Sequence, residues 1–137
     1  MPPANRTLTL SVMEGRYAIA KFPCDAAIPD WANGAAFFSV TRTLEELSVV
    51  TGETSLPAEL DASRGWRMLK VHGPFGFDET GVVAALANPL ARVGVGIFVI
   101  STFDTDYLLV QQEEIPVAVE TLEHAGHQIL QSELLNS

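Results

Sequence analysis

Two short segments of the sequence combine residue types that could hold a small charged molecule. The first, Gly73-Pro74-Phe75-Gly76-Phe77-Asp78-Glu79-Thr80-Gly81, leads into a predicted helix. Glycines let a backbone approach a ligand closely, and a helix N-terminus offers free N–H groups with a positive partial charge. This segment therefore suits a ligand carboxylate, although a plain turn between a strand and a helix would use the same residues.

The second segment is Ser101-Thr102-Phe103-Asp104-Thr105-Asp106. Asp104 or Asp106 could accept hydrogen bonds from an ammonium group, and Thr102 adds a hydroxyl. Aspartate and threonine are also common in ordinary hairpin turns, so this segment alone indicates little. Together the two segments offer donors for a carboxylate and acceptors for an amine, which is the pair of charges that an amino acid carries.

Other reactive side chains point to no cofactor and no metal. Cys24 is the single cysteine, so neither an intramolecular disulfide nor a site of several thiolates can form. His124 and His127 are three residues apart, but no third ligand follows at a helpful spacing. His72 precedes the first segment and is expected to pack at a strand end.

Catalytic motifs are also missing from the sequence. It contains no Gly-x-Ser-x-Gly elbow and no glycine-rich phosphate loop followed by Lys-Ser/Thr. The acidic pairs Glu45-Glu46 and Glu113-Glu114 are adjacent in sequence and expected to be solvated. We therefore predict a protein that is not an enzyme, with a small enzyme as a minor alternative.

The composition excludes several classes of partner. Hydrophobic residues make up 47% of the chain and charged residues 18%, which is enough apolar material for a folded core. The formal net charge of −9 argues against nucleic acids and anionic membranes, because both require a basic surface. The apolar stretch Val93–Val110 is interrupted by polar residues, and the first residues lack a long apolar run. The cytoplasm is the predicted location.

The first half of the sequence predicts short strands with little helix. They are expected at Thr7–Val12, Tyr17–Phe22, Phe37–Arg42 and Leu47–Thr51, with a hairpin turn at Met13–Arg16 and one helical turn near Trp31. The aromatic residues Trp31, Phe37 and Phe38 are expected in the core, with an exposed interface patch as the alternative. Gly52–Gly65 has no sustained period and predicts a linker. The predicted division is therefore 1–62 and 63–137.

The second half predicts the order β-α-β-β-α-β. Strands are expected at Trp66–Val71, 97–101, Tyr107–Val110 and His127–Leu130. One helix is expected from an Asp78 cap through Ala91, kinked or tightened near Pro89, and another from about Pro116 to Gly126. That order is the ferredoxin-like unit. The predicted fold class is α+β, with two ferredoxin-like units, the C-terminal one complete and the N-terminal one strand-rich and abbreviated.

Three motifs of the second half resemble the ACT domains of the cytosolic arginine sensors of animals and their short bacterial relatives. They are Gly76…Gly81-Val82, Pro89-Leu90-Ala91 and Ser101-Thr102-Phe103-Asp104-Thr105-Asp106-Tyr107. In the first half, FFSVTRTLEELSVV resembles the shorter N-terminal ACT-like unit of that family. The resemblance implies tandem ACT-type units that bind an amino acid between two such units.

The same resemblance implies the site. Its expected ligand-binding residues are Gly76, Glu79, Thr80, Gly81, Val82, Thr102, Phe103 and Asp106. Glu79 and Asp106 would face the cationic parts of a ligand, with backbone near Gly81 and Val82 facing its carboxylate. Arginine or another cationic amino acid is the implied ligand, and a homodimer would complete the site. A protein-interaction module whose ligand pocket is lost remains the alternative.

Overall fold

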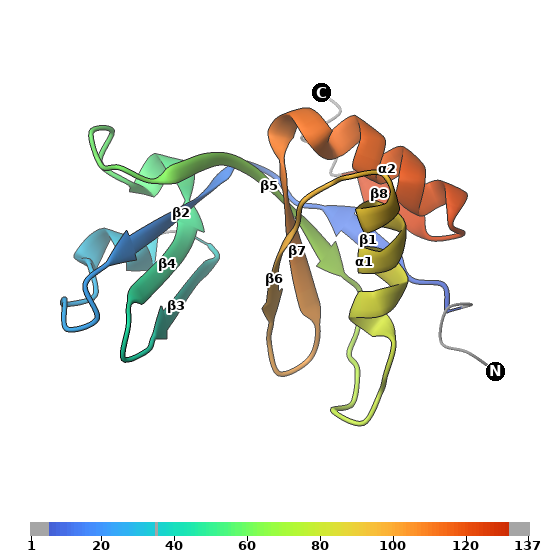
Figure 1. Ribbon diagram of the computed structural model, residues 1–137, viewed down its shortest axis with the longest axis horizontal. Coiled ribbons are helices and arrows are strands. Elements are labelled where there is room, and N and C mark those ends of the chain that lie inside the picture. Colours follow the sequence, from blue (N-terminus) through green and yellow to red (C-terminus); the bar gives the residue numbers. More distant parts are fainter. Residues whose placement is uncertain (1–5, 35, 132–137) are drawn as a thin grey trace. The chain divides into compact units, whose positions relative to one another are not determined.

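The computed structural model describes residues 6–34 and 36–131, and these form two compact units (Figure 1). One unit is Gly15–Trp66, and the other combines Met1–Glu14 with Arg67–Ser137. This division differs from the predicted one at 62/63, because the first strand falls in the C-terminal unit.

The C-terminal unit contains a mixed sheet and both α-helices. Its elements are β1 (Thr9–Val12), β5 (Ser63–Val71), α1 (Val82–Arg92), β6 (Phe98–Ser101), β7 (Asp106–Gln111), α2 (Ile115–His124) and β8 (Gln128–Gln131). The strands are ordered β6-β7-β5-β1-β8, and only the β1–β8 pair is parallel among those with a recorded register. From β5 to β8 the order is β-α-β-β-α-β, so the predicted α+β class and the complete ferredoxin-like unit are confirmed.

Strand β1 corrects the predicted N-terminal hairpin. It pairs antiparallel with β5 and parallel with β8, with Leu10 opposite both Val71 and Ile129. The reason lies in its alternating side chains, since Leu10 and Val12 are at most 2% exposed and belong to the helix-covered core. Met13 N–H continues the pairing by donating to Met68 O over 2.8 Å. A hairpin turn therefore does not follow β1.

Both helices cover one face of this sheet. Helix α1 buries Val82, Ala85, Leu86, Pro89 and Leu90, which recur at helical spacing, and α2 buries Ala118 and Leu122. Leu10, Leu69 and Leu108 of the sheet pack in the same cluster. Burying each leucine contributes about 1.5–3 kcal/mol, so this cluster fixes the position of α1 on the sheet.

Helix α1 begins later than the sequence predicted. Asp78 does not cap it, because the helix begins at Val82 after Gly81, whose φ of 81° lies in the left-handed region. Residues 76–79 form a separate turn, in which Glu79 N–H donates to Gly76 O over 3.0 Å. A side chain at 81 would be strained, so glycine there sets the direction in which the helix starts.

Pro89 stands inside α1 and shapes a buried contact. Because proline has no N–H, it cannot bond the carbonyl of Ala85 one turn earlier. His127 Nε2 lies 3.1 Å from Ala85 O, and His127 Nδ1 accepts the Leu8 N–H over 3.1 Å. Because Nδ1 accepts in this contact, Nε2 is placed to donate to Ala85 O, and the imidazole joins α1 to the chain before β1.

The N-terminal unit is a small sheet without an α-helix among its described residues. Strands β2 (Tyr17–Phe22), β3 (Phe38–Arg42) and β4 (Leu47–Gly52) are ordered β3-β4-β2, and β2 also pairs with the start of β5 at Ser63 and Trp66. Short 3-10 turns occupy Asp30–Gly34 and Glu53–Ser55. The prediction of an abbreviated, strand-rich unit is thus confirmed.

Its core is correspondingly small. Ala32, Leu47 and Val49 are buried, with Phe22 and Trp31 packed against them. The expected core position of Trp31 is therefore confirmed. Phe37 contacts the Tyr17 ring, with centroids 6.0 Å apart, whereas Phe38 is 44% exposed.

Across the described part of the chain, no helix is long and apolar enough to cross a membrane.

Candidate functional site

A groove of about 370 Å³ opens in the C-terminal unit between the start of α1 and the β6–β7 turn. Seven of the eight residues expected at a ligand site line it, and Thr80 does not. The seven are Gly76, Glu79, Gly81, Val82, Thr102, Phe103 and Asp106. The structure therefore brings the two segments singled out in the sequence to opposite sides of one cavity.

The first side of the groove is the N-terminus of α1. The first bond of the helix runs from Ala85 N–H to Gly81 O over 2.9 Å. The N–H groups of Val82, Val83 and Ala84 therefore have no acceptor within the helix, and all three residues line the groove. Such a terminus favours a negatively charged group.

The opposite side is the turn between β6 and β7. Thr102 N–H donates to Thr105 O over 2.8 Å, and Thr105 N–H donates to Thr102 Oγ1 over 3.3 Å. The Thr105 hydroxyl in turn donates to Val71 O over 2.5 Å, which fastens the turn to the end of β5. The Thr102 hydroxyl is thus used inside the turn.

A direct contact holds the two sides together. Phe75 N–H donates to Asp104 O over 2.7 Å. At Gly73 an added Cβ would lie 2.9 Å from Asp104 O, so the close approach of the two segments requires glycine there. A backbone contact therefore holds the two segments close together.

Asp106 supplies a carboxylate to the groove. It opens β7 opposite Ser101, whose hydroxyl donates to Asp106 Oδ1. The side chain is half-buried and lines the cavity together with Thr102. A carboxylate held in this way can accept hydrogen bonds from an ammonium group.

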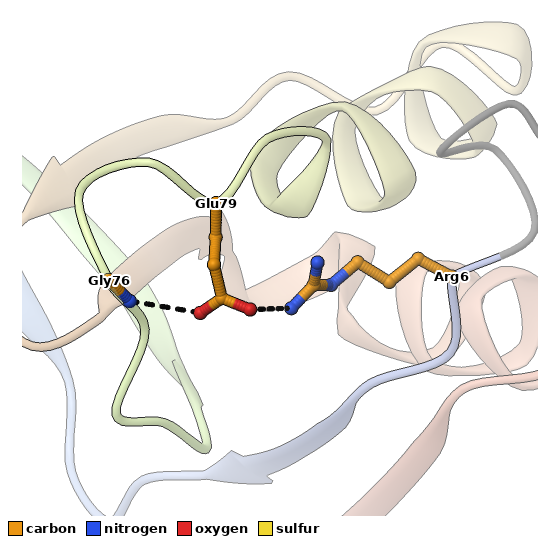
Figure 2. Close-up of polar contacts among 3 residues, drawn as sticks. All are labelled: Arg6, Gly76 and Glu79. Atoms are coloured by element: carbon orange, nitrogen blue, oxygen red, sulfur yellow. Dashed lines mark hydrogen bonds and ion pairs between the residues drawn. The ribbon is translucent and has the colours of Figure 1, made fainter.

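Glu79, in contrast, is already paired within the chain (Figure 2). Its Oε2 accepts the Gly76 N–H over 2.9 Å, and its Oε1 accepts from Arg6 Nη2 over 2.9 Å. The Arg6 guanidinium first, and the Gly76 N–H second, hold the pKa of the Glu79 carboxyl below its ordinary value of 4.5. Arg6 also stacks over the Phe75 ring at 5.2 Å.

The sequence reasoning missed Arg6. It lies 73 residues before Glu79, and no periodicity or motif links the two positions. The one available signal was its charge in a strongly acidic chain, next to the first strand. The placement of β1 beside β5 brings Arg6 to Glu79, which lines the groove.

Two aromatic rings stand at the edge of the groove. Phe77 and Phe103 are 78% and 77% exposed, and their rings meet edge to face with centroids 4.8 Å apart. Phenylalanines this exposed, and in contact with each other, form an apolar patch. This patch is open to a further molecule.

The histidines take no part in the groove. His127 is 5% exposed and uses both ring nitrogens in the contacts described above, and His72 Nε2 lies 2.6 Å from the Ser11 hydroxyl. Within residues 6–34 and 36–131, no group of three or more His, Cys, Asp or Glu side chains could hold a metal ion. Cys24 is a free thiol.

Two families match the chain in its two halves. The ACT domain matches residues 61–124, and a second family, described as an N-terminal domain, matches residues 15–59. The N-terminal match lies wholly within the compact unit Gly15–Trp66. Together the matches cover both parts in which the sequence resembled ACT-like units.

A solved structure and two curated proteins are similar to this chain, in addition to the two family matches. The crystal structure of protein Atu0741 from Agrobacterium tumefaciens is 41% identical, covers 93% of this chain and 96% of its own, and superposes with a TM-score of 0.88. Cytosolic arginine sensor for mTORC1 subunit 1 from Rattus norvegicus is 48% identical over 59 residues, which is 42% of this chain and 18% of the sensor. The Bos taurus protein is 35% identical over 100 residues, or 67% of this chain and 30% of that one. The chain thus spans under a third of the length of these two sensors.

More distant structures share the fold. The regulatory subunit of aspartate kinase from Thermus thermophilus is 14% identical with a TM-score of 0.58, over 85% of this chain and 95% of that subunit. At that identity the match supports the architecture alone. The fold is therefore shared by proteins with widely different sequences.

Proposed function

The chain belongs to the ACT domain family, and from that premise we propose that it is a non-catalytic regulatory protein that binds an amino acid. The observation that carries the proposal is the groove itself, which residues 82–84 at the start of α1 line together with Asp106. A zwitterion needs a site for each of its two charges, and these sites lie within one cavity of about 370 Å³.

The proposed mode of binding follows from the chemistry of each side. The α-carboxylate of the ligand accepts hydrogen bonds from the backbone N–H groups at Val82 and Val83, where the helix partial charge is positive. The α-ammonium donates to Asp106, whose Oδ1 is oriented by the Ser101 hydroxyl. The turn and the helix are already fixed by the core, so little order is lost on binding.

A second ACT unit is proposed to cover the groove. The exposed Phe77–Phe103 pair at its edge offers an apolar surface for that contact. We propose that a second copy of the chain supplies it, giving a homodimer with ligand at the interface. The likeness to sensors named as cytosolic favours the cytoplasm as the location.

The proposal is tested by thermal unfolding of the purified chain with each of the twenty amino acids. A ligand at about 100 times its Kd stabilises the folded state by roughly 2.7 kcal/mol, which is a clear shift. Asp106→Asn should remove that shift. Asp104→Asn is the matched control, because it removes the same charge from the same turn but does not line the groove.

The alternative function is a protein-interaction module that has lost its small ligand, and the exposed Phe77–Phe103 pair favours it. It predicts a flat response to all twenty amino acids. It also predicts that Phe77→Ser abolishes capture of a protein partner that wild type retains. A response to one amino acid that survives Asp104→Asn and disappears in Asp106→Asn would exclude it.

A further inference from the structure

One charged residue next to the groove, Arg6, is not among the site residues that the family resemblance implied. Among the residues lining it, Glu79 and Asp106 carry negative charge. Arg6 lies outside the lining but bonds Glu79 Oε1 over 2.9 Å and covers the Phe75 ring. The chain therefore provides its own cation for one of the two carboxylates.

The Arg6–Glu79 contact is partly shielded rather than fully exposed. The two side chains are 27% and 38% exposed, and the second oxygen of Glu79 is occupied by the Gly76 N–H. Arg6 Nε is buried with no hydrogen-bond partner among the described residues, so the contact is a single bond instead of a two-pronged fork. Glu79 thus has both oxygens engaged before any ligand arrives.

We infer that Arg6 determines which ligands the groove accepts, and that it selects amino acids with an uncharged, apolar side chain over cationic ones. This inference rests on the proposed function. An amino acid places its carboxylate at the helix N-terminus and its ammonium at Asp106. The remaining carboxylate, Glu79, is balanced by Arg6, so a second positive charge on the ligand has no unpaired partner.

The lining near Glu79 supports the same class of ligand. Phe75, Phe77, Val82 and Val83 line the groove together with the exposed Phe103 ring. These side chains stabilise an apolar group by burying it from water, at about 25 cal/mol per Å² of apolar surface. A cationic side chain would have to lose its hydration there without a free carboxylate in return.

The test measures binding of leucine, methionine, phenylalanine, arginine and lysine to the full chain by calorimetry. Wild type should bind at least one of the three uncharged amino acids on the order of tenfold more tightly than arginine or lysine. Arg6→Gln removes the balancing charge, so the preference for uncharged over cationic ligands should fall by a similar factor. The change should shrink at high salt, because exposed charges are screened.

Three further variants separate charge from structure. Arg6→Lys keeps the charge and should keep the wild-type preference. The double variant Arg6→Gln with Glu79→Gln restores the balance and should also return the wild-type preference, which a structural role of Arg6 would not do. Arg92→Gln removes a positive charge from the far end of α1 and should leave the preference unchanged.

The outcomes separate this inference from the proposed function. Tighter binding of arginine or lysine than of every uncharged probe by wild type overturns the inference and leaves the proposed function standing. An unchanged preference in Arg6→Gln does the same. Absence of binding of all five probes to wild type and to every variant overturns the inference, and a flat response to all twenty amino acids overturns the proposed function as well.

Discussion

The hairpins of the two units make the same turn and differ in what lies beside it. Thr43 N–H donates to Glu46 O over 2.9 Å in the N-terminal unit, and Thr102 N–H donates to Thr105 O over 2.8 Å in the C-terminal unit. In both, the threonine Oγ1 accepts the N–H of the fourth residue. The turn is therefore a local product of its leading threonine, and it indicates no ligand by itself.

The neighbouring positions separate the two hairpins. In the C-terminal hairpin Asp106 is paired with Ser101. At the corresponding position of the N-terminal hairpin, Leu47 is paired with Arg42. Leu47 is fully buried in the small core, and the Arg42 guanidinium donates to the Cys24 and Ala26 carbonyls. The C-terminal hairpin thus has an acid beside a helix N-terminus where the N-terminal hairpin has a core residue. The comparison teaches that the surroundings of the turn make the site.

Exchanging the residues at this position should give the largest effect. Leu47→Asp places a carboxylate in the N-terminal core and removes apolar contacts, so the free energy of unfolding should fall by about 3–5 kcal/mol. Asp106→Leu should change it by less than about 1 kcal/mol, because Asp106 is only half-buried. Urea denaturation measures both. Equal losses would contradict the contrast between the two positions.

The fourth turn residue should give the next largest effect. Thr105 is 9% exposed and its hydroxyl donates to Val71 O, so Thr105→Val should cost about 1–2 kcal/mol. Glu46 contributes to its turn through backbone groups, so Glu46→Gln should stay within about 0.5 kcal/mol. Thermal and urea unfolding of the two variants would measure these changes in the free energy of unfolding. A neutral Thr105→Val would mean that the turn is not fastened to β5.

The second turn residue should give a smaller difference. Phe103 contacts Phe77, so Phe103→Ser should cost about 0.5–1.5 kcal/mol. Leu44 is 97% exposed, and Leu44→Ser should leave stability unchanged within about 0.5 kcal/mol. Differential scanning calorimetry can compare them. A larger loss from Leu44→Ser would reveal a contact for Leu44 that the structure does not contain.

The smallest expected effect is the change with pH in the contribution of Glu79 to the free energy of unfolding. The N-terminal hairpin has no counterpart of this contribution. The pKa of Glu79 is lowered in the folded chain, so its contribution to stability is present above the unfolded value of 4.5 and is lost as pH falls through the folded pKa. The stability difference between wild type and Glu79→Gln should therefore vanish in acid. In an NMR titration, Arg6→Gln should move the Glu79 midpoint upward. A midpoint that does not respond to Arg6→Gln would exclude Arg6 as the main cause.

Local patterns predicted most elements and the two sides of the groove. The alternation in TLSV and FFSVTR, the Gly-rich loop and the Ser-Thr-aromatic turn each carry their signal within a few residues. The partners of β1 could not be predicted in this way, because pairing with β5 and β8 depends on residues far along the chain. Arg6 was missed for the same reason.

The structure around two other residues also went beyond what their own types indicated. Asp78 is an acceptable helix cap by type, but the turn that begins at Gly76 and the left-handed Gly81 delay the start of α1. Pro89 was predicted to kink or tighten the last turn of α1, and the carbonyl that it leaves free meets His127, a contact that the local sequence did not indicate. Whether a proline bends a helix or is accommodated depends on which donor lies near the released carbonyl.

The pairing of β1 with β5 makes the N-terminal unit an insertion between two neighbouring strands. The chain leaves the C-terminal unit at Glu14 and returns at Arg67, while Met13 N–H already bonds Met68 O. Closing a loop costs only about 0.6 kcal/mol more for each doubling of its length, so evolution can exchange such a module at little energetic cost. Replacing residues 15–66 with an Asn-Gly turn would then yield a minimal ACT scaffold. The same junction could accept a reporter domain for use as a biosensor.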